Sequence, residues 1–145
     1  MFLSLTASVT FCNGAALPKG QDWLKKQADA IVTGTNLEVS AETREVKDFG
    51  GIQAITTCAS KVKIETIEKG EGIGLGDAVT VYSQRHAWKG PGLEPPGHHL
   101  HSYTPVTGQR LQVFYKADEQ SKNQVLFPNG MEQAEEAEKK KAPGS

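Results

Sequence analysis

The stretch CASKVKIETIEKG, residues 58–70, decides the fold class of this chain. Within it, Val62 and Ile64 alternate with Lys61 and Lys63. Successive side chains of a β-strand point to opposite faces, so one face of this segment is apolar and the other is charged. The pattern therefore predicts a strand with one face in a core and the other in water.

Similar alternation recurs on both sides of this stretch, in residues 31–39, 78–82, 109–115 and 123–127. Gly34 interrupts the first of these segments, which predicts a bulge or a bend there. The pair Gly50-Gly51 predicts a turn, and the glycine-rich residues 70–77 predict the long loop of a β-hairpin. Residues 22–30 have the composition of a short helix.

The length of 145 residues favours one domain, and 37% hydrophobic residues allow a modest core. Sixteen basic and seventeen acidic side chains leave a formal charge of −1. A surface for nucleic acid needs a clear basic excess, so we expect no nucleic-acid partner. Only two cysteines occur, Cys12 and Cys58, and they form no zinc-binding spacing. We expect Cys58 to be a small buried residue.

Residues 1–16 carry no charge and end in the small residues Gly14-Ala15-Ala16. This composition is typical of a signal peptide cleaved after Ala16, although a buried β-strand would also fit. We therefore expect an exported protein that is periplasmic, on the cell surface or secreted. No stretch is long and apolar enough for a transmembrane helix. We expect the domain to occupy residues 17–130, followed by a charged tail, residues 131–145, that is disordered or a frayed helix.

Five short strands in one small domain predict an all-β fold, a five-stranded barrel with a short N-terminal helix. The segments ADAIVTG, VKIETIEKG, GDAVTV and GQRLQVF follow one another, beginning at residues 28, 62, 76 and 108. In this order the chain resembles exported bacterial domains related to the netrin module and the tissue inhibitors of metalloproteinases. The resemblance covers roughly residues 28–130 and implies an OB-like barrel. Those inhibitors begin with a zinc-binding cysteine, which the predicted N-terminus at Leu17 lacks, so protease inhibition is not carried over.

Residues 85–105 hold four of the seven prolines and all four histidines, and we interpret them as a long surface loop. Four of its side chains form a candidate partner-binding surface of aromatic and basic character: Arg85, Trp88, Lys89 and Tyr103. Such side chains recognise proteins, sugars or nucleotides on barrels of this type. The alternative for Trp88 is that it caps one end of the barrel, while Tyr82, Phe114 and Tyr115 are expected in the core or the barrel wall.

The histidines also form a candidate metal site. His98, His99 and His101 lie within four residues of one another, and His86 lies upstream. In an extended chain His99 and His101 project to the same side, and imidazole is a good ligand for zinc or copper. Glu94 adds a possible oxygen ligand. The alternative is that these are ordinary histidines of a polar loop, with no cofactor bound.

The sequence offers little for catalysis. The glycines at 70, 72, 74 and 76 match neither a dinucleotide fingerprint nor a phosphate loop. A triad requires a serine or cysteine next to a histidine held by a carboxylate, and no such set can be singled out in the sequence. We therefore expect a non-catalytic, exported binding or structural domain that recognises a protein or polysaccharide partner through residues 85–105. A metal-binding protein is the second hypothesis, and a small hydrolase is the third.

Overall fold

The computed structural model of the chain describes residues 18–48, 50–94, 101, 103–135 and 137. The expected signal peptide, including Cys12, and the histidines His98 and His99 lie outside these residues. Most of the expected charged tail also lies outside them. The predictions that concern these residues stay predictions.

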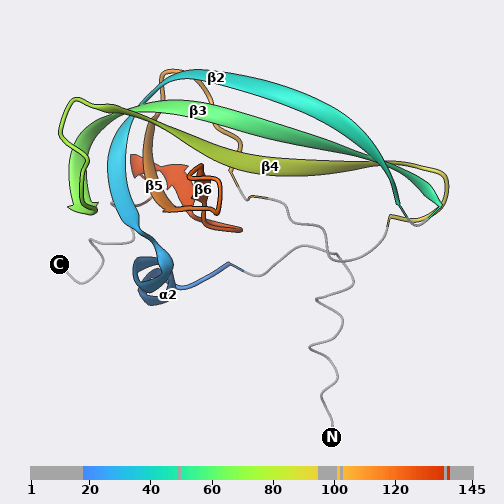
Figure 1. Cartoon of the computed structure of the whole chain (residues 1–145), viewed down its shortest axis with the longest axis horizontal. Coiled ribbons are helices and arrows are strands. Elements are labelled where there is room, and N and C mark those ends of the chain that lie inside the picture. The colour runs from blue at the N-terminus through green and yellow to red at the C-terminus, as the bar shows by residue number, and fades with distance from the viewer. Residues whose placement is uncertain (1–17, 49, 95–100, 102, 136, 138–145) are drawn as a thin grey trace, which may run out of the picture.

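The described chain is mostly β, as predicted, and contains one short helix. Its elements are α2 (Gln21–Gln27), β2 (Ala30–Asp48), β3 (Gly51–Lys69), β4 (Ala78–Gly90), β5 (Arg110–Ala117), β6 (Asn123–Val125) and β7 (Met131–Gln133). The strands lie in the order β2-β3-β4-β6-β5-β7, and β2 also pairs with β5. This extra pairing closes β2, β3, β4, β6 and β5 into a ring of five strands (Figure 1). Among the described residues, no helix has the length and apolar character needed to span a membrane.

The main core fills the inside of the ring. The alternation predicted for β3 and β5 is confirmed, because Val62 and Ile64 of β3 and Leu111 and Val113 of β5 are all at most 1% exposed. The buried residues of this cluster are Ala30, Val32, Val62, Ile64, Val81, Leu111, Val113, Tyr115, Val125 and Met131. Full burial of one such aliphatic side chain contributes about 1.5–3 kcal/mol. The ring is therefore held mainly by its interior.

Helix α2 covers part of the outside of the ring. Leu24 and Ala28 lie four residues apart and pack against Ile31 of β2 and Phe114 of β5. Trp23, next to Leu24 on the helix, is 39% exposed. A second, smaller core thus forms where β2 and β5 close the ring, and the helix seals it.

Gly34 lies at a bulge in β2, as predicted from the sequence. The register between β2 and β3 shifts between Thr33 and Gly34. A Cβ atom built on Gly34 would lie 2.0 Å from the backbone oxygen of Lys63. Only a residue without a side chain allows the two strands to approach this closely, so Gly34 fixes the bend that brings β2 onto β5.

Beyond the ring, β2, β3 and β4 continue as a long three-stranded arm (Figure 1). We define the arm as residues 40–48, 51–59 and 82–90. It corrects one prediction: residues 85–90 are not part of a loop, because β4 pairs with β3 as far as Gly90. The prolines of this region begin only at Pro91, so they end the strand rather than exclude it.

The chain stays packed after residue 130, where the domain was expected to end. Strand β7 pairs with β5, and Met131 and Ala134 are each 2% exposed. Ala137 is also buried. Within the arm, Cys58 is buried as expected, at 6% exposure.

Replacement of Gly34 by alanine tests whether the close approach of β2 and β3 is essential. The new methyl group meets backbone atoms, which cannot move without shifting the strand. We expect a loss of about 1–3 kcal/mol in the free energy of unfolding, the usual range for overpacking. Urea denaturation followed by circular dichroism measures it. Gly20→Ala is the control, because Gly20 has φ −71 and open space around it; equal stability of the two variants would contradict the assignment.

Candidate functional site

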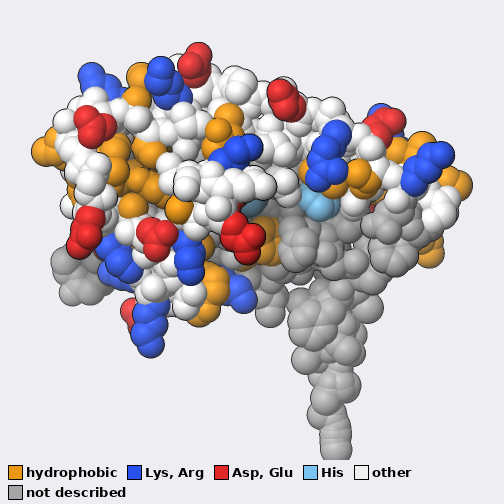
Figure 2. Space-filling model, viewed as in Figure 1, with side chains coloured by type: hydrophobic (Ala, Val, Ile, Leu, Met, Phe, Trp, Pro, Cys, Tyr) orange, Lys and Arg blue, Asp and Glu red, His pale blue; other side chains and the backbone are white. Residues whose placement is uncertain are grey.

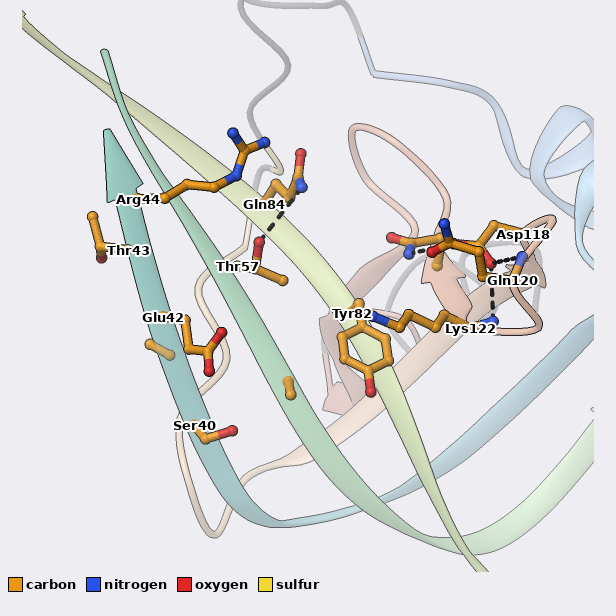
Figure 3. A pocket seen from close by; sticks show the side chains of 13 residues that line it. Ser40, Glu42, Thr43, Arg44, Thr57, Tyr82, Gln84, Asp118, Gln120 and Lys122 are labelled. Carbon is orange, nitrogen blue, oxygen red and sulfur yellow. Dashed lines mark hydrogen bonds between the residues drawn. The ribbon is translucent and has the colours of Figure 1, made fainter. Parts of the chain in front are cut away.

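A polar groove runs across the arm close to the ring (Figure 3). Strand pairing lines up its floor in two rows across β2, β3 and β4. The first row is Ser40, Ala59 and Tyr82, and the second is Glu42, Thr57 and Gln84. Because side chains two residues apart share a face of a strand, these six side chains lie on one face of the arm.

The depth of the groove follows from the sizes of these side chains. The middle strand contributes the short side chains of Ala59 and Thr57, whereas the flanking strands contribute longer ones. The result is a trough of about 900 Å³ along the arm. Across its floor, the amide of Gln84 donates a hydrogen bond to the Thr57 hydroxyl at 3.5 Å. Arg44 extends from β2 on the same face, in the direction of Gln84 (Figure 3).

The loop between β5 and β6 forms the opposite wall of the groove. Asp118 organises this loop: its Oδ1 accepts hydrogen bonds from the backbone N–H groups of Gln120 at 2.8 Å and Lys122 at 2.9 Å. Its Oδ2 accepts from the Gln124 amide at 3.0 Å. Lys122 then extends over the ring of Tyr82, with 5.5 Å between its Nζ and the ring centroid. The loop is thereby fixed against β4.

The groove is polar and electrically balanced. It is lined by two acidic side chains, Glu42 and Asp118, and by two basic ones, Arg44 and Lys122. Hydrogen bonds to the backbone N–H of Lys122 and to Gln124 and Gln120 hold the pKa of Asp118 below its usual range. Asp118 is therefore ionised at neutral pH. Most of the other lining groups are amides and hydroxyls.

The structure separates the four residues predicted to bind a partner. Arg85 lies on the face of the arm opposite the groove, opposite Thr56. Lys89 forms an ion pair with Glu45 of β2. Trp88 is half-buried on the groove face, and its indole N–H donates a hydrogen bond to the Gly92 carbonyl at 2.9 Å.

Tyr103 lies apart from the other three. It packs against the core cluster inside the ring, and its hydroxyl donates a hydrogen bond to the Gln109 side chain. Trp88 lies near the tip of the arm, seven residues along β4 from the core residue Val81. At ~3.3 Å per residue that separation is roughly 23 Å, so Tyr103 and Trp88 do not share one surface.

Of the predicted metal ligands, the structure describes His86, His101 and Glu94. His101 Nε2 lies 3.1 Å from the Val125 carbonyl oxygen, and its Nδ1 lies 3.1 Å from the Gln84 backbone N. With the proton on Nε2, the ring donates to one group and accepts from the other. Both nitrogens of His101 therefore join β4 to β6. Among the described residues, no three histidine, cysteine, aspartate or glutamate side chains cluster as a metal site.

The residues that build the groove were missed by the sequence analysis. Tyr82 was expected in the core or the barrel wall, and it is half-buried on the outside of the arm. Residues 40–45, SAETRE, show no apolar and polar alternation, so the sequence carries no strand signal for this part of β2. The pairing of these residues with β4 across β3 has no local signature.

Comparisons of the chain with protein-family models, with curated proteins and with solved structures found no match. The interpretation of the groove consequently rests on its own geometry and chemistry. These define a long, open and polar trough whose charges balance, with the aromatic ring of Tyr82 at one end.

Replacement of Asp118 by alanine tests its role in holding the wall of the groove. The change leaves the N–H groups of Gln120 and Lys122 without their acceptor. We expect amide hydrogen exchange at these two residues to accelerate at least tenfold, because the loop opens locally more often. Asp77→Ala is the control. Asp77 accepts a hydrogen bond from Gly74 in the β3–β4 loop, so its removal accelerates exchange there and leaves residues 120 and 122 unchanged.

Proposed function

We propose that this chain is a non-catalytic binding domain that holds a polysaccharide strand in the groove of its arm. The observation that carries the proposal is the pair of cross-strand rows, in which short central residues lie between polar walls. A trough open along the sheet accommodates a chain-like ligand, whereas a small-molecule site is usually an enclosed, largely apolar cavity.

The lining chemistry favours a neutral, hydroxyl-rich ligand. Glutamine amides both donate and accept hydrogen bonds, so Gln84, Gln120 and Gln124 match sugar hydroxyls, which do the same. The ring of Tyr82 supplies an apolar surface for one sugar face. Opposite charges in the groove balance, and lysine and arginine are interspersed with aspartate and glutamate on the surface seen in Figure 2. Neither feature attracts a polyanion such as nucleic acid.

Asp118 does not suit the role of the acid in glycoside hydrolysis. A glycoside hydrolase needs one carboxylic acid whose pKa is raised so that it can donate a proton. The pKa of Asp118 is lowered instead, by the hydrogen bonds that hold its loop. Asp118 therefore serves as a structural anchor in this proposal.

Export and an OB-like barrel form part of the same proposal. The ring of five strands supports the OB-like interpretation, since such barrels bind oligosaccharides on their strands and loops. A polysaccharide that follows the arm outward from Tyr82 reaches Trp88, which lies six residues along β4 on the same face. That distance is roughly 20 Å at ~3.3 Å per residue, the length of several sugar units. Residues 85–90 thus keep a role in binding, as part of a strand.

Affinity electrophoresis tests the proposed function. The purified chain is run in native gels that contain xylan, hydroxyethyl cellulose or alginate. We expect retardation by at least one of the two neutral polysaccharides and none by anionic alginate. Tyr82→Ala is expected to weaken binding at least tenfold, because a buried aromatic contact commonly dominates such an interface.

Two arginines of the arm provide a matched pair of variants. Arg44→Ala removes a groove side chain, whereas Arg85→Ala removes the same side chain from the opposite face. We expect only the first to weaken retardation. No retardation by either neutral polysaccharide would reject the polysaccharide proposal, and a loss with Arg85→Ala alone would move the site to the other face.

The ionised state of Asp118 gives binding a defined pH dependence. Its pKa in the folded chain lies below the ordinary 3.8, so its contribution is complete above that pH and is lost as pH falls through the lowered value. Titration calorimetry with the retarding polysaccharide is expected to give equal affinity at pH 7 and 5, and a decline only as the pH is lowered stepwise below 3.8. We expect the Asp118→Ala variant to bind the polysaccharide weakly already at pH 7 and to lose less affinity than the unmodified chain at low pH. An equal drop in both proteins would contradict this role.

A further inference from the structure

The outer edge of β2 is open along the arm. Strand β5 pairs with β2 only from Ala30 to Thr35, and the backbone of Asn36 bonds to Gly108 and Gln109. Beyond that point, no strand or loop among the residues that the structure describes pairs with this edge. Residues 40–45 are all exposed. Free edges of this length are templates for pairing with another chain.

The hydrogen-bond pattern of the sheet shows which residues of β2 direct their backbone N–H and carbonyl groups to the open edge. Gln84 directs both its backbone groups away from β3, because they bond to the backbone and ring of His101. Gln84 and Thr57 are therefore a non-hydrogen-bonded pair, in which the backbone groups of both residues point away from each other. The backbone N–H and carbonyl of Thr57 consequently point to β2, where they bond to Glu42. Glu42 therefore points its backbone groups inward. The pairing of Asp48 with Gly51 at the two-residue hairpin turn leads to the same result, because Asp48 must then point its backbone groups toward β3, as Glu42 does.

The residues between those inward-pointing positions direct their N–H and carbonyl groups to the open edge. They are Val39, Ala41, Thr43, Glu45 and Lys47. This set is symmetric about Thr43. An antiparallel copy of the same strand, related by a two-fold axis at Thr43, pairs Val39 with Lys47 and Ala41 with Glu45. That register uses every free group of the edge.

The side chains agree with this register. About Thr43, Glu42 of one copy lies opposite Arg44 of the other, and the contact occurs twice. These are non-hydrogen-bonded positions, where opposing side chains come closest. A shift of the axis to Glu42, Arg44 or Glu45 places like charges opposite each other on the axis. A shift to Ala41 leaves the outward groups of Glu45 and Lys47 unpaired.

We propose that two copies of this chain associate through the edges of β2, antiparallel about Thr43, to form one six-stranded arm. The inference is independent of the ligand proposed for the groove. An interface made of one strand edge is smaller than a standard protein interface, so the dimer is weak and dynamic. We expect a Kd on the order of 10–100 μM for the full chain.

Sedimentation velocity of the full chain without ligand tests the proposal, from about 1 to 500 μM. Thr43→Pro removes an outward N–H and leaves the β2–β3 ladder intact, so we expect the Kd to rise at least tenfold. Thr43→Ala is its control. It loses only the hydroxyl contact with Thr56 and keeps the Kd within about twofold.

A charge reversal tests the same interface with a variant that keeps the backbone unchanged, in case the proline variant does not fold. Arg44→Glu places two glutamates opposite each other and is expected to weaken the dimer at least tenfold. The double variant Glu42→Arg with Arg44→Glu restores opposite charges and is expected to restore the Kd. A chain that stays monomeric at 500 μM overturns the proposal. So does a dimer that both Thr43→Pro and Arg44→Glu leave unchanged.

Discussion

The continuous antiparallel pairing of β2 with β3 is the interaction on which the rest of the structure depends. It runs from Ile31 to Asp48 on one strand, so the same ladder forms one side of the ring and two thirds of the arm. Inside the ring it contributes Val32, Val62 and Ile64 to the core. Along the arm, Ala54, Ile55 and Cys58 of β3 are buried, but they belong to neither of the two core clusters formed by the described residues. Within the ring, the ladder bends at Gly34, where the backbones of β2 and β3 approach too closely for any side chain.

Much of the ring was predictable because its strands alternate in the simplest way. In residues 58–70 one face is apolar and the other polar, as in the structure, and the expected Leu111, Val113 and Tyr115 of β5 are buried together. Strand β5 also buries Gln112 and Phe114 on its other face, which alternation alone did not predict. The turn at Gly50-Gly51 and the long loop at residues 70–77 were also predicted correctly, since glycine supplies the positive φ that Gly50, Gly70, Gly72 and Gly76 adopt. Closure of β2 onto β5 was not derivable from periodicity, because it pairs strands about 80 residues apart.

The arm and the groove were missed for one common reason. The outer part of β2 is exposed on both faces over residues 40–45 and therefore lacks the hydrophobic alternation by which strands are recognised. In β4, residues 85–90 were predicted as part of a loop because of the prolines that follow Gly90. The structure shows these residues as a strand paired with β3. Tyr82 and Gln84 form a site only when β3 sets them opposite Glu42 and Ser40. Such a site is a property of strand register, which sequence patterns specify weakly where neither face is buried.

The polysaccharide groove and the proposed β2–β2 dimer involve the same face of the arm. A two-fold axis perpendicular to a sheet keeps the same face of both copies on the same side, so pairing at Thr43 places two grooves side by side. Ser40, Glu42 and Arg44 then lie at the centre of the combined face, and each groove continues outward to its own Asp118 loop. A long polysaccharide that bridges both grooves is bound twice, and the second contact is intramolecular, which raises the overall affinity without new contacts. Weak pairing of the strand edges is sufficient for this effect, because the ligand itself holds the two copies together.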